Sequence, residues 1–231
     1  MPEITKEEYI RRALKFVEAH KASYTERELD YIKKNCEWGM DRPFVSDLLR
    51  QVYDEAGMTD INQNMYEGFL KLLEENFDIN RDIIEIGGGI NPSLAKKIAL
   101  RQKSGTITVY DPRLISNIYS DIPNLKLKKQ AVSSNTNIEQ ADLYIAFMPC
   151  EATQTIIDIA GKNQTDFIIA ACEGGPHGDI YDYFEDEEEW LHSMMYHARR
   201  QIENNGLGTF ERKSLQKYND PYPVFFNRRS R

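Results

Sequence analysis

Asp82-Ile83-Ile84-Glu85-Ile86-Gly87-Gly88-Gly89-Ile90-Asn91-Pro92-Ser93 joins an apolar run to a glycine-rich turn and then to the start of a predicted helix. Gly87 and Gly89 can adopt positive φ without a Cβ clash, so a ligand can lie directly against the backbone of this turn. The first amides of the following helix lack intrahelical acceptors and carry a partial positive charge. We expect Asn91 to cap that helix, with Pro92 in its first position. The stretch is typical of a nucleotide-binding turn.

The next apolar run, Thr106-Ile107-Thr108-Val109-Tyr110, ends at Asp111. Folds of this kind bind ribose hydroxyls with an acid about 20 residues past the glycines, which is where Asp111 lies. The dinucleotide fingerprint G-x-G-x-x-G requires a third glycine where this chain has Pro92. A nicotinamide or flavin cofactor is therefore disfavoured.

The glycine turn resembles motif I of the class I S-adenosylmethionine-dependent methyltransferases, an acidic residue, an apolar one and then G-x-G-x-G. Asn91 stands in place of the third glycine, and asparagine is the non-glycine residue that best tolerates left-handed backbone. Asp111 matches the acidic ribose ligand of the family's second motif. The resemblance implies S-adenosylmethionine as cofactor, bound by Glu85, Gly87, Gly88, Gly89, Asn91, Asp111, Pro112, Gln130, Ala131, Phe147, Met148 and Pro149.

Length and composition limit the class of protein. The chain has 231 residues, and its 37 acidic against 29 basic side chains give a formal charge of −8, which disfavours a nucleic-acid partner. The three cysteines have no zinc-ligand spacing, as expected of reduced thiols in the cytosol. The polar N-terminus and the absence of a long apolar run predict a soluble, cytoplasmic protein with no membrane segment. The sequence does not indicate an oligomeric state.

Two regions differ in hydrophobic pattern. Residues 1–78 show helical spacing and predict an all-helical N-terminal cap of about four helices, in which Thr25 and Glu28 have the form of a capping box. Residues 79–231 alternate between strands and helices, which predicts an α/β, Rossmann-like, mostly parallel sheet. The expected strands are 83–86, 107–110, 127–131, 143–147 and 167–171, and the expected helices are 92–101, 114–119, 151–161 and 181–204.

The C-terminal segment has two strand-like runs, 207–212 and 223–228, joined by the turn-rich residues 218–221. They are expected to pair as an antiparallel hairpin. A parallel sheet that ends in an antiparallel strand is what the methyltransferase resemblance implies.

Ligands of open α/β sheets collect beyond the carboxyl ends of the strands, so the residues that follow each strand are candidates for chemistry. After the fourth strand, Phe147 and Pro149 are expected to shape the pocket and Glu151 to position or deprotonate a substrate group. Alternatively, Glu151 complements the N-terminal dipole of its helix. The Asp/Asn-Pro-Pro-aromatic signature of methyltransferases that modify amino groups on bases and related nitrogens is absent here.

A glycine-rich loop after the fifth strand contains His177, the best candidate for a general base because its unperturbed pKa of about 6.5 suits proton removal near neutrality. A solvated surface role is the alternative for a lone loop histidine. Cys150, Cys172 and Asp179 could in principle join His177 in a metal site. Nothing in their spacing requires a metal, so no metal site is predicted.

Other residues are also candidates for the site or have a structural interpretation. Gln130 is the nearest match to the residue that the family presents to the adenine amino group. Ser93 either makes helix-start hydrogen bonds or contacts the cofactor. The acidic run 185–189 is interpreted as the solvated first turn of a long helix. The cap aromatics either pack between helices or form an acceptor-binding wall; they are Tyr24, Tyr31, Trp38 and Phe44.

Together these patterns predict S-adenosylmethionine-dependent methyl transfer to an acceptor, expected to be a small molecule because of the negative charge and the missing signature. The alternative is a non-catalytic, methyltransferase-like binding module that acts through a protein partner on the helical cap. A nicotinamide oxidoreductase is a third hypothesis, against which Pro92 counts.

Overall fold

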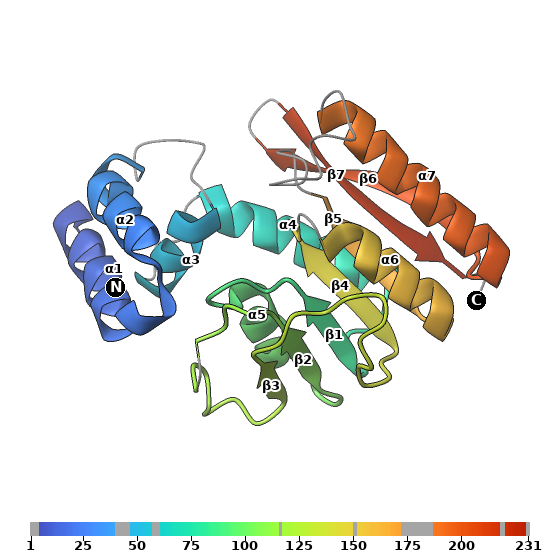
Figure 1. Cartoon of the computed structure of the whole chain (residues 1–231), viewed down its shortest axis with the longest axis horizontal. Coiled ribbons are helices and arrows are strands. Elements are labelled where there is room, and N and C mark those ends of the chain that lie inside the picture. Colours follow the sequence, from blue (N-terminus) through green and yellow to red (C-terminus); the bar gives the residue numbers. More distant parts are fainter. Residues whose placement is uncertain are drawn as a thin grey trace.

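The computed structural model describes residues 5–39, 47–56, 61–115, 117–149, 152–171, 187–217 and 220–229. The described helices and strands follow one another from a helical N-terminal part into an alternating α/β part (Figure 1). In chain order they are α1 (Lys6–Ala19), a 3-10 turn (Lys21–Ser23), α2 (Glu26–Gly39), α3 (Asp47–Ala56), α4 (Ile61–Asn76), β1 (Ile83–Ile86), α5 (Ser93–Arg101), β2 (Ile107–Tyr110), β3 (Leu125–Lys128), β4 (Leu143–Phe147), α6 (Ala152–Asn163), β5 (Asp166–Ala170), α7 (Glu187–Asn205), β6 (Thr209–Lys217) and β7 (Asp220–Arg228).

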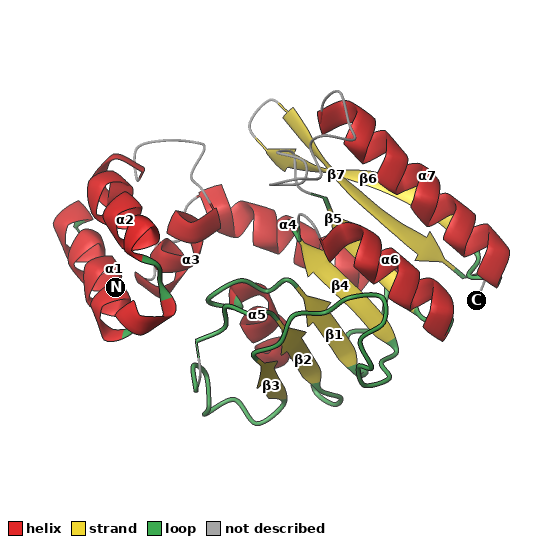
Figure 2. Ribbon diagram, in the orientation of Figure 1, coloured by secondary structure: helices red, strands yellow, loops and turns green. Residues whose placement is uncertain are grey.

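One seven-stranded sheet forms the centre of the α/β part, with the strand order β3-β2-β1-β4-β5-β7-β6 (Figure 2). The strands β1 to β5 are parallel, and β7 runs antiparallel to both β5 and β6. The predicted fold class, including the C-terminal antiparallel hairpin, is confirmed. The strand order reverses between β1 and β4, which creates the switch point at which such sheets bind ligands.

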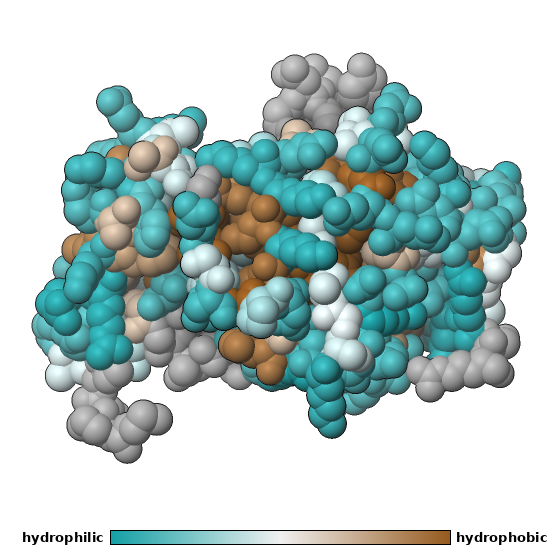
Figure 3. Space-filling model, turned by 90° about the horizontal axis from the view of Figure 1, so that it is seen from below, coloured by the Kyte–Doolittle hydropathy of each residue, from teal (hydrophilic) through white to brown (hydrophobic). Residues whose placement is uncertain are grey.

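Helices cover both faces of the sheet, which explains why β1, β2, β4 and β5 consist almost entirely of buried residues. On one face, α4 and α5 contribute Phe69 and Leu94 to a core that includes Ile83 and Val109. On the other, α6 and α7 pack Ile156 and other apolar side chains against the strands. Hydrophilic residues occupy most of the underside of the molecule, with apolar residues visible between them in the middle of that face (Figure 3).

The helices α1, α2 and α3 enclose a separate apolar cluster that contains Val17, Ile32 and Val52. Ile90 of the glycine turn and Ile115 belong to the same cluster, so the cap packs directly on the segment that follows β1. Helix α4 lies between this group and the sheet (Figure 1). The domain boundary at residue 78 stays a prediction.

The predicted capping box at the start of α2 is confirmed. The amide of Thr25 donates to Glu28 Oε2 at 2.8 Å, and the amide of Glu28 donates to Thr25 Oγ1 at 3.2 Å. These two bonds satisfy amides that the first helical turn leaves without intrahelical acceptors.

Two secondary-structure predictions are wrong. The expected helix at 114–119 is not formed at the described residues of that stretch: 117–119 form turns, and Asn117 and Tyr119 have φ of 66° and 59°, which a right-handed helix does not accommodate. The strand expected at 127–131 is β3, which ends at Lys128. Gln130 and Ala131 therefore lie in the exposed loop beyond β3.

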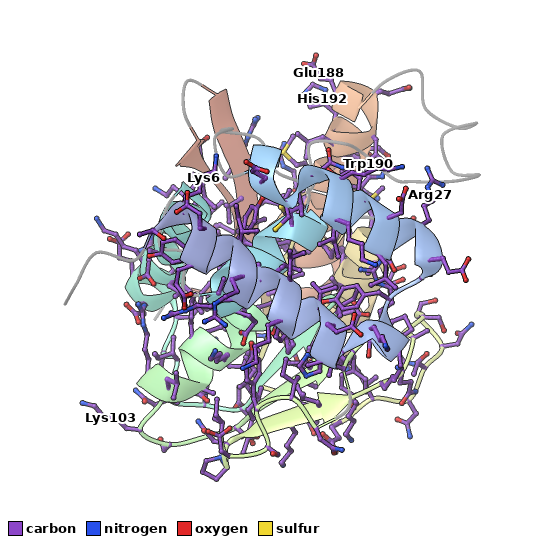
Figure 4. All side chains as sticks on the ribbon, turned by 90° about the vertical axis from the view of Figure 1, so that its left-hand side faces the viewer. Lys6, Arg27, Lys103, Glu188, Trp190 and His192 are labelled. Atoms are coloured by element: carbon purple, nitrogen blue, oxygen red, sulfur yellow. The ribbon has the colours of Figure 1, made fainter. Side chains whose placement is uncertain are left out.

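Helix α7 begins at Glu187 within the described residues, and Glu188 and Glu189 are exposed as expected for the acidic run. Figure 4 shows Glu188 and His192 projecting outward from the upper part of this helix. The rest of that run, like residues 172–186 as a whole, lies outside the described residues. Among the described helices, none combines the length and apolar character needed to cross a bilayer.

Candidate functional site

The glycine turn follows β1 at the carboxyl edge of the sheet, between β2 and β4, its two neighbours in the strand order. Gly87 and Gly89 have φ of 81° and 75°, so both adopt the backbone conformation that the sequence predicted for them. The amide of Gly87 donates to the carbonyl of Tyr110, at the end of β2, at 2.9 Å. This bond holds the turn against the neighbouring strand.

Asp111 connects the end of β2 to the glycine turn. Its Oδ2 accepts a hydrogen bond from the amide of Gly89 at 2.9 Å, and its Oδ1 accepts one from the amide of Arg113 at 2.7 Å. The residue is only 9% exposed. Each carboxylate oxygen has two lone pairs, so both oxygens keep acceptor capacity for ligand hydroxyls after these bonds are formed.

The turn has no room for larger residues. A Cβ on Gly87 would come within 3.3 Å of Pro149 Cβ, and a Cβ on Gly88 would lie 2.5 Å from Val109 Cγ1. The backbone of the turn is thus packed tightly against the segment after β4 on one side and against β2 on the other. Glycine is therefore required at Gly87 and Gly88 by close packing within the protein itself.

Ser93, the first residue of α5, has a buried hydroxyl with no hydrogen-bond partner among the described residues. It lines a narrow cavity together with Gly87, Gly88 and Tyr66, and the free volume of about 10 Å³ corresponds to one water molecule. The helix-start role considered for Ser93 is not observed, and the expected Asn91 cap is wrong. Pro92 occupies the capping position without a side-chain bond.

The segment after β4 faces the same cavity. Phe147 lines it and packs against Tyr66 of α4, with ring centroids 4.9 Å apart. Met148 has a positive φ of 54°, and Pro149 is buried against the turn. Glu85, in β1, is 2% exposed and also lines the cavity. The geometry therefore brings the predicted residues of the first and fourth strands together.

Among the described residues, the other predicted site residues make no defined hydrogen bond to the residues of the glycine turn. Pro112, Gln130 and Ala131 are exposed. The catalytic candidates Glu151 and His177 lie outside the described residues, as do the possible metal ligands Cys150, Cys172 and Asp179. Within the described ranges, no group of three His, Cys, Asp or Glu residues has a metal-binding arrangement.

A polar cluster that no sequence pattern predicted lies beside the turn, and it is formed by Glu55, Lys96, Tyr119 and Asn91. Glu55 comes from the cap helix α3 and Lys96 from α5. Their positions share no sequence spacing, so no local pattern could have indicated that they meet.

The observed geometry suits an adenosyl cofactor. Two glycines with positive φ expose the backbone, a sheltered carboxylate stands at the end of β2, and a buried hydroxyl without a partner among the described residues opens α5. This combination at the switch point, together with the antiparallel β7, defines the fold of the class I S-adenosylmethionine-dependent methyltransferases.

The fold agrees with that of a solved methyltransferase. The chain is similar to magnesium protoporphyrin IX methyltransferase from Synechocystis PCC 6803, solved with bound SAH, at a TM-score of 0.50 and 12% identity, over 87% of this chain and 97% of that one. It is also similar to the N-methyltransferase NodS from Bradyrhizobium japonicum WM9, at a TM-score of 0.49 and 14% identity, over 74% and 99%. No family model matches the sequence, and neither does any curated protein.

Proposed function

We propose that the protein is an enzyme that transfers a methyl group from S-adenosylmethionine to an acceptor. The observation that supports this most is the pairing of Asp111 with the amide of Gly89, because a carboxylate that could accept hydrogen bonds from ribose hydroxyls then stands directly beside the glycine turn. The fold shared with the magnesium protoporphyrin IX methyltransferase, which was solved with bound SAH, agrees with this cofactor.

Different residues of the site would bind different parts of the cofactor. Asp111 would accept hydrogen bonds from the ribose hydroxyls, and the backbone of Gly87 and Gly89 would lie along the ligand. Ser93 would supply a hydroxyl to its polar amino-acid end, which is the polar partner that this buried oxygen lacks among the described residues. The bound cofactor supplies an activated methyl group on a sulfonium leaving group.

Alignment and exclusion of water are then the main tasks of the protein. Phe147 and Tyr66 form an aromatic wall beside the turn that can exclude water from the reacting atoms. A base is needed only where the acceptor must lose a proton, and His177 and Glu151 stay predictions for that role.

The net charge of the protein favours a small molecule as the methyl acceptor. The net charge of −8 repels phosphate backbones unless a local basic surface offsets it. The acceptor itself has to be found by screening.

Isothermal titration with S-adenosylmethionine, S-adenosylhomocysteine and NADH tests the cofactor assignment before any acceptor is known. We expect the two adenosyl compounds to bind with micromolar affinity, about −8 kcal/mol, and NADH to give no heat. Asp111→Ala should reduce the affinity at least about tenfold, since it removes the acceptor for the ribose hydroxyls.

Asp82→Ala provides a matched control at the opposite edge of the same strands. Asp82 Oδ1 accepts a hydrogen bond from the amide of Thr106 at 2.9 Å, just as Asp111 accepts one from Gly89, but it precedes β1 instead of following β2. This variant should bind the cofactor like the wild type. Absence of binding to either adenosyl compound by the wild-type protein would refute the proposed function. Binding without turnover on any acceptor would favour a non-catalytic module.

A further inference from the structure

The glycine turn makes a second polar contact that the proposed cofactor chemistry does not require. The hydroxyl of Tyr119 lies within hydrogen-bond distance of Asn91 Oδ1, in the turn, and of Glu55 Oε1, in the cap helix α3. Its single proton is shared between these two acceptors. Asn91 is fully buried, so water cannot replace the Tyr119 hydroxyl as its partner unless the surrounding structure rearranges.

Lys96 of α5 completes the group. Its Nζ lies 3.2 Å from Glu55 Oε1 and 4.4 Å from the centroid of the Tyr119 ring. The side chains of Lys96 and Glu55 are 29% and 14% exposed, so solvent screens this ion pair less than a pair on the open surface. The lysine balances the charge of Glu55 and holds the ring of Tyr119 from one face.

The backbone at Tyr119 indicates that these contacts determine the local conformation. Its φ of 59° is unfavourable for a bulky residue, and Asn117 nearby also has a positive φ, 66°. Such conformations persist where the surrounding contacts over-determine them, and they are concentrated at functional sites. The Tyr119 hydroxyl is the group that this backbone directs toward Asn91 and Glu55.

A second bond ties the cap to the other loop of the site. Glu28 Oε1, in α2, lies 3.1 Å from Arg113 Nη1, and the amide of Arg113 donates to Asp111. Tyr24 is buried, and desolvation followed by the carboxylates of Glu28 and Glu55 raises its pKa above the usual range. The polar contacts therefore extend from one cofactor loop to the other along the base of the cap.

We propose that Tyr119 and Glu55 are positioning residues that fix the glycine turn through Asn91, so that the affinity for the adenosyl cofactor depends on contact with the helical cap. The cofactor part of this inference rests on the proposed function, whereas the anchoring of the turn does not. A merely structural contact would change the stability of the protein without changing the affinity of the folded protein for its ligand.

Tyr119→Phe removes only the shared hydroxyl and keeps the ring beside Lys96. Tyr144→Phe is the matched control, because Tyr144 is fully buried in β4 and its hydroxyl accepts one hydrogen bond from Asn163, at 2.7 Å, away from the turn. We expect Tyr119→Phe to weaken S-adenosylhomocysteine binding about five- to tenfold, and Tyr144→Phe to leave it within about twofold. Glu55→Gln retains an acceptor oxygen and should bind more tightly than Glu55→Ala.

Hydrogen exchange of the ligand-free proteins separates the two proposals. Amides of residues 87–91 and of Ser93 should exchange faster in Tyr119→Phe than in the wild type and in Tyr144→Phe. If the wild-type protein does not bind S-adenosylhomocysteine, the proposed function fails, and this exchange still decides whether the cap anchors the turn. Unchanged exchange at these residues in Tyr119→Phe would overturn the inference. If the wild type binds S-adenosylhomocysteine, an unchanged affinity of Tyr119→Phe would overturn it too.

Discussion

Gly88→Ala tests whether the glycine turn is as tightly packed as the structure shows. The added Cβ would lie 2.5 Å from Val109 Cγ1 and 3.2 Å from Pro92 Cβ. Carbon atoms in contact prefer about 3.5–4.0 Å, so the closer pair overlaps by roughly 1 Å. Val109 is fully buried in β2, and a β-branched side chain has few alternative rotamers. Either the valine or the turn must therefore shift.

Overpacking of this kind costs about 1–3 kcal/mol. For a chain of this size, each kcal/mol lowers the melting temperature by about 2–4 °C. Thermal unfolding of the ligand-free protein, followed by circular dichroism, should therefore show a decrease of roughly 2–12 °C for Gly88→Ala. Because no ligand is present, the result does not depend on the proposed function.

Gly161→Ala is the control for the glycine substitution itself. Its Cβ would also come close to another atom, 2.6 Å from Gln201 Oε1, but that atom is at the end of a flexible side chain. Gly161 lies in α6, where alanine is favoured over glycine by about 1 kcal/mol, so the variant should be near neutral or stabilised. The packing argument would be refuted if Gly88→Ala unfolded at the wild-type temperature. It would also be refuted if Val109→Ala, added to Gly88→Ala, failed to restore part of the lost stability.

Three other changes have defined outcomes. Asn227→Ala should lower the free energy of unfolding by at least about 2 kcal/mol in urea denaturation, because the buried amide accepts from the Phe167 amide and donates to the Leu207 carbonyl. Thr25→Ala should cost about 1 kcal/mol and Thr25→Ser much less, since only the serine keeps the capping oxygen. Burial raises the pKa of Cys36 from 9.0 to about 11, so the protonated thiol is favoured in the fold. Stability should fall as pH rises from 9 toward 11, and Cys36→Ala should flatten that decrease.

The sequence predicted the central strands because their causes are local. The runs 83–86, 107–110 and 143–147 are mostly apolar, and each became a strand with those bounds. Positive φ at Gly87 and Gly89 was predictable for the same reason, since glycine relieves the Cβ clash by itself. The place of Asp111 beside the glycine turn was likewise predictable from its position after the second strand, and its role in ribose binding stays a prediction.

Tertiary contacts explain where the local patterns gave wrong predictions. Residues 114–119 were predicted to form a helix between two strands, yet Tyr119 adopts left-handed backbone while its hydroxyl reaches Asn91 and Glu55. Asn91 was expected to cap α5, but its buried side chain bonds to Tyr119 instead. Neither outcome depends on neighbours in the sequence, so periodicity and capping rules could not predict them.

Anchoring of the turn from the cap has a consequence for the cap itself, because coupling between two sites is reciprocal. If the Tyr119 hydroxyl strengthens cofactor binding about tenfold, the cofactor must stabilise the Tyr119 contact by the same factor, about 1.4 kcal/mol. Saturating S-adenosylhomocysteine should then slow hydrogen exchange in α3, which carries Glu55, by more than it slows exchange in α6. A cap that only covered the site would gain the general stabilisation that any bound ligand gives to both helices. The difference between the two helices therefore measures how far the cap and the cofactor loop behave as one cooperative unit.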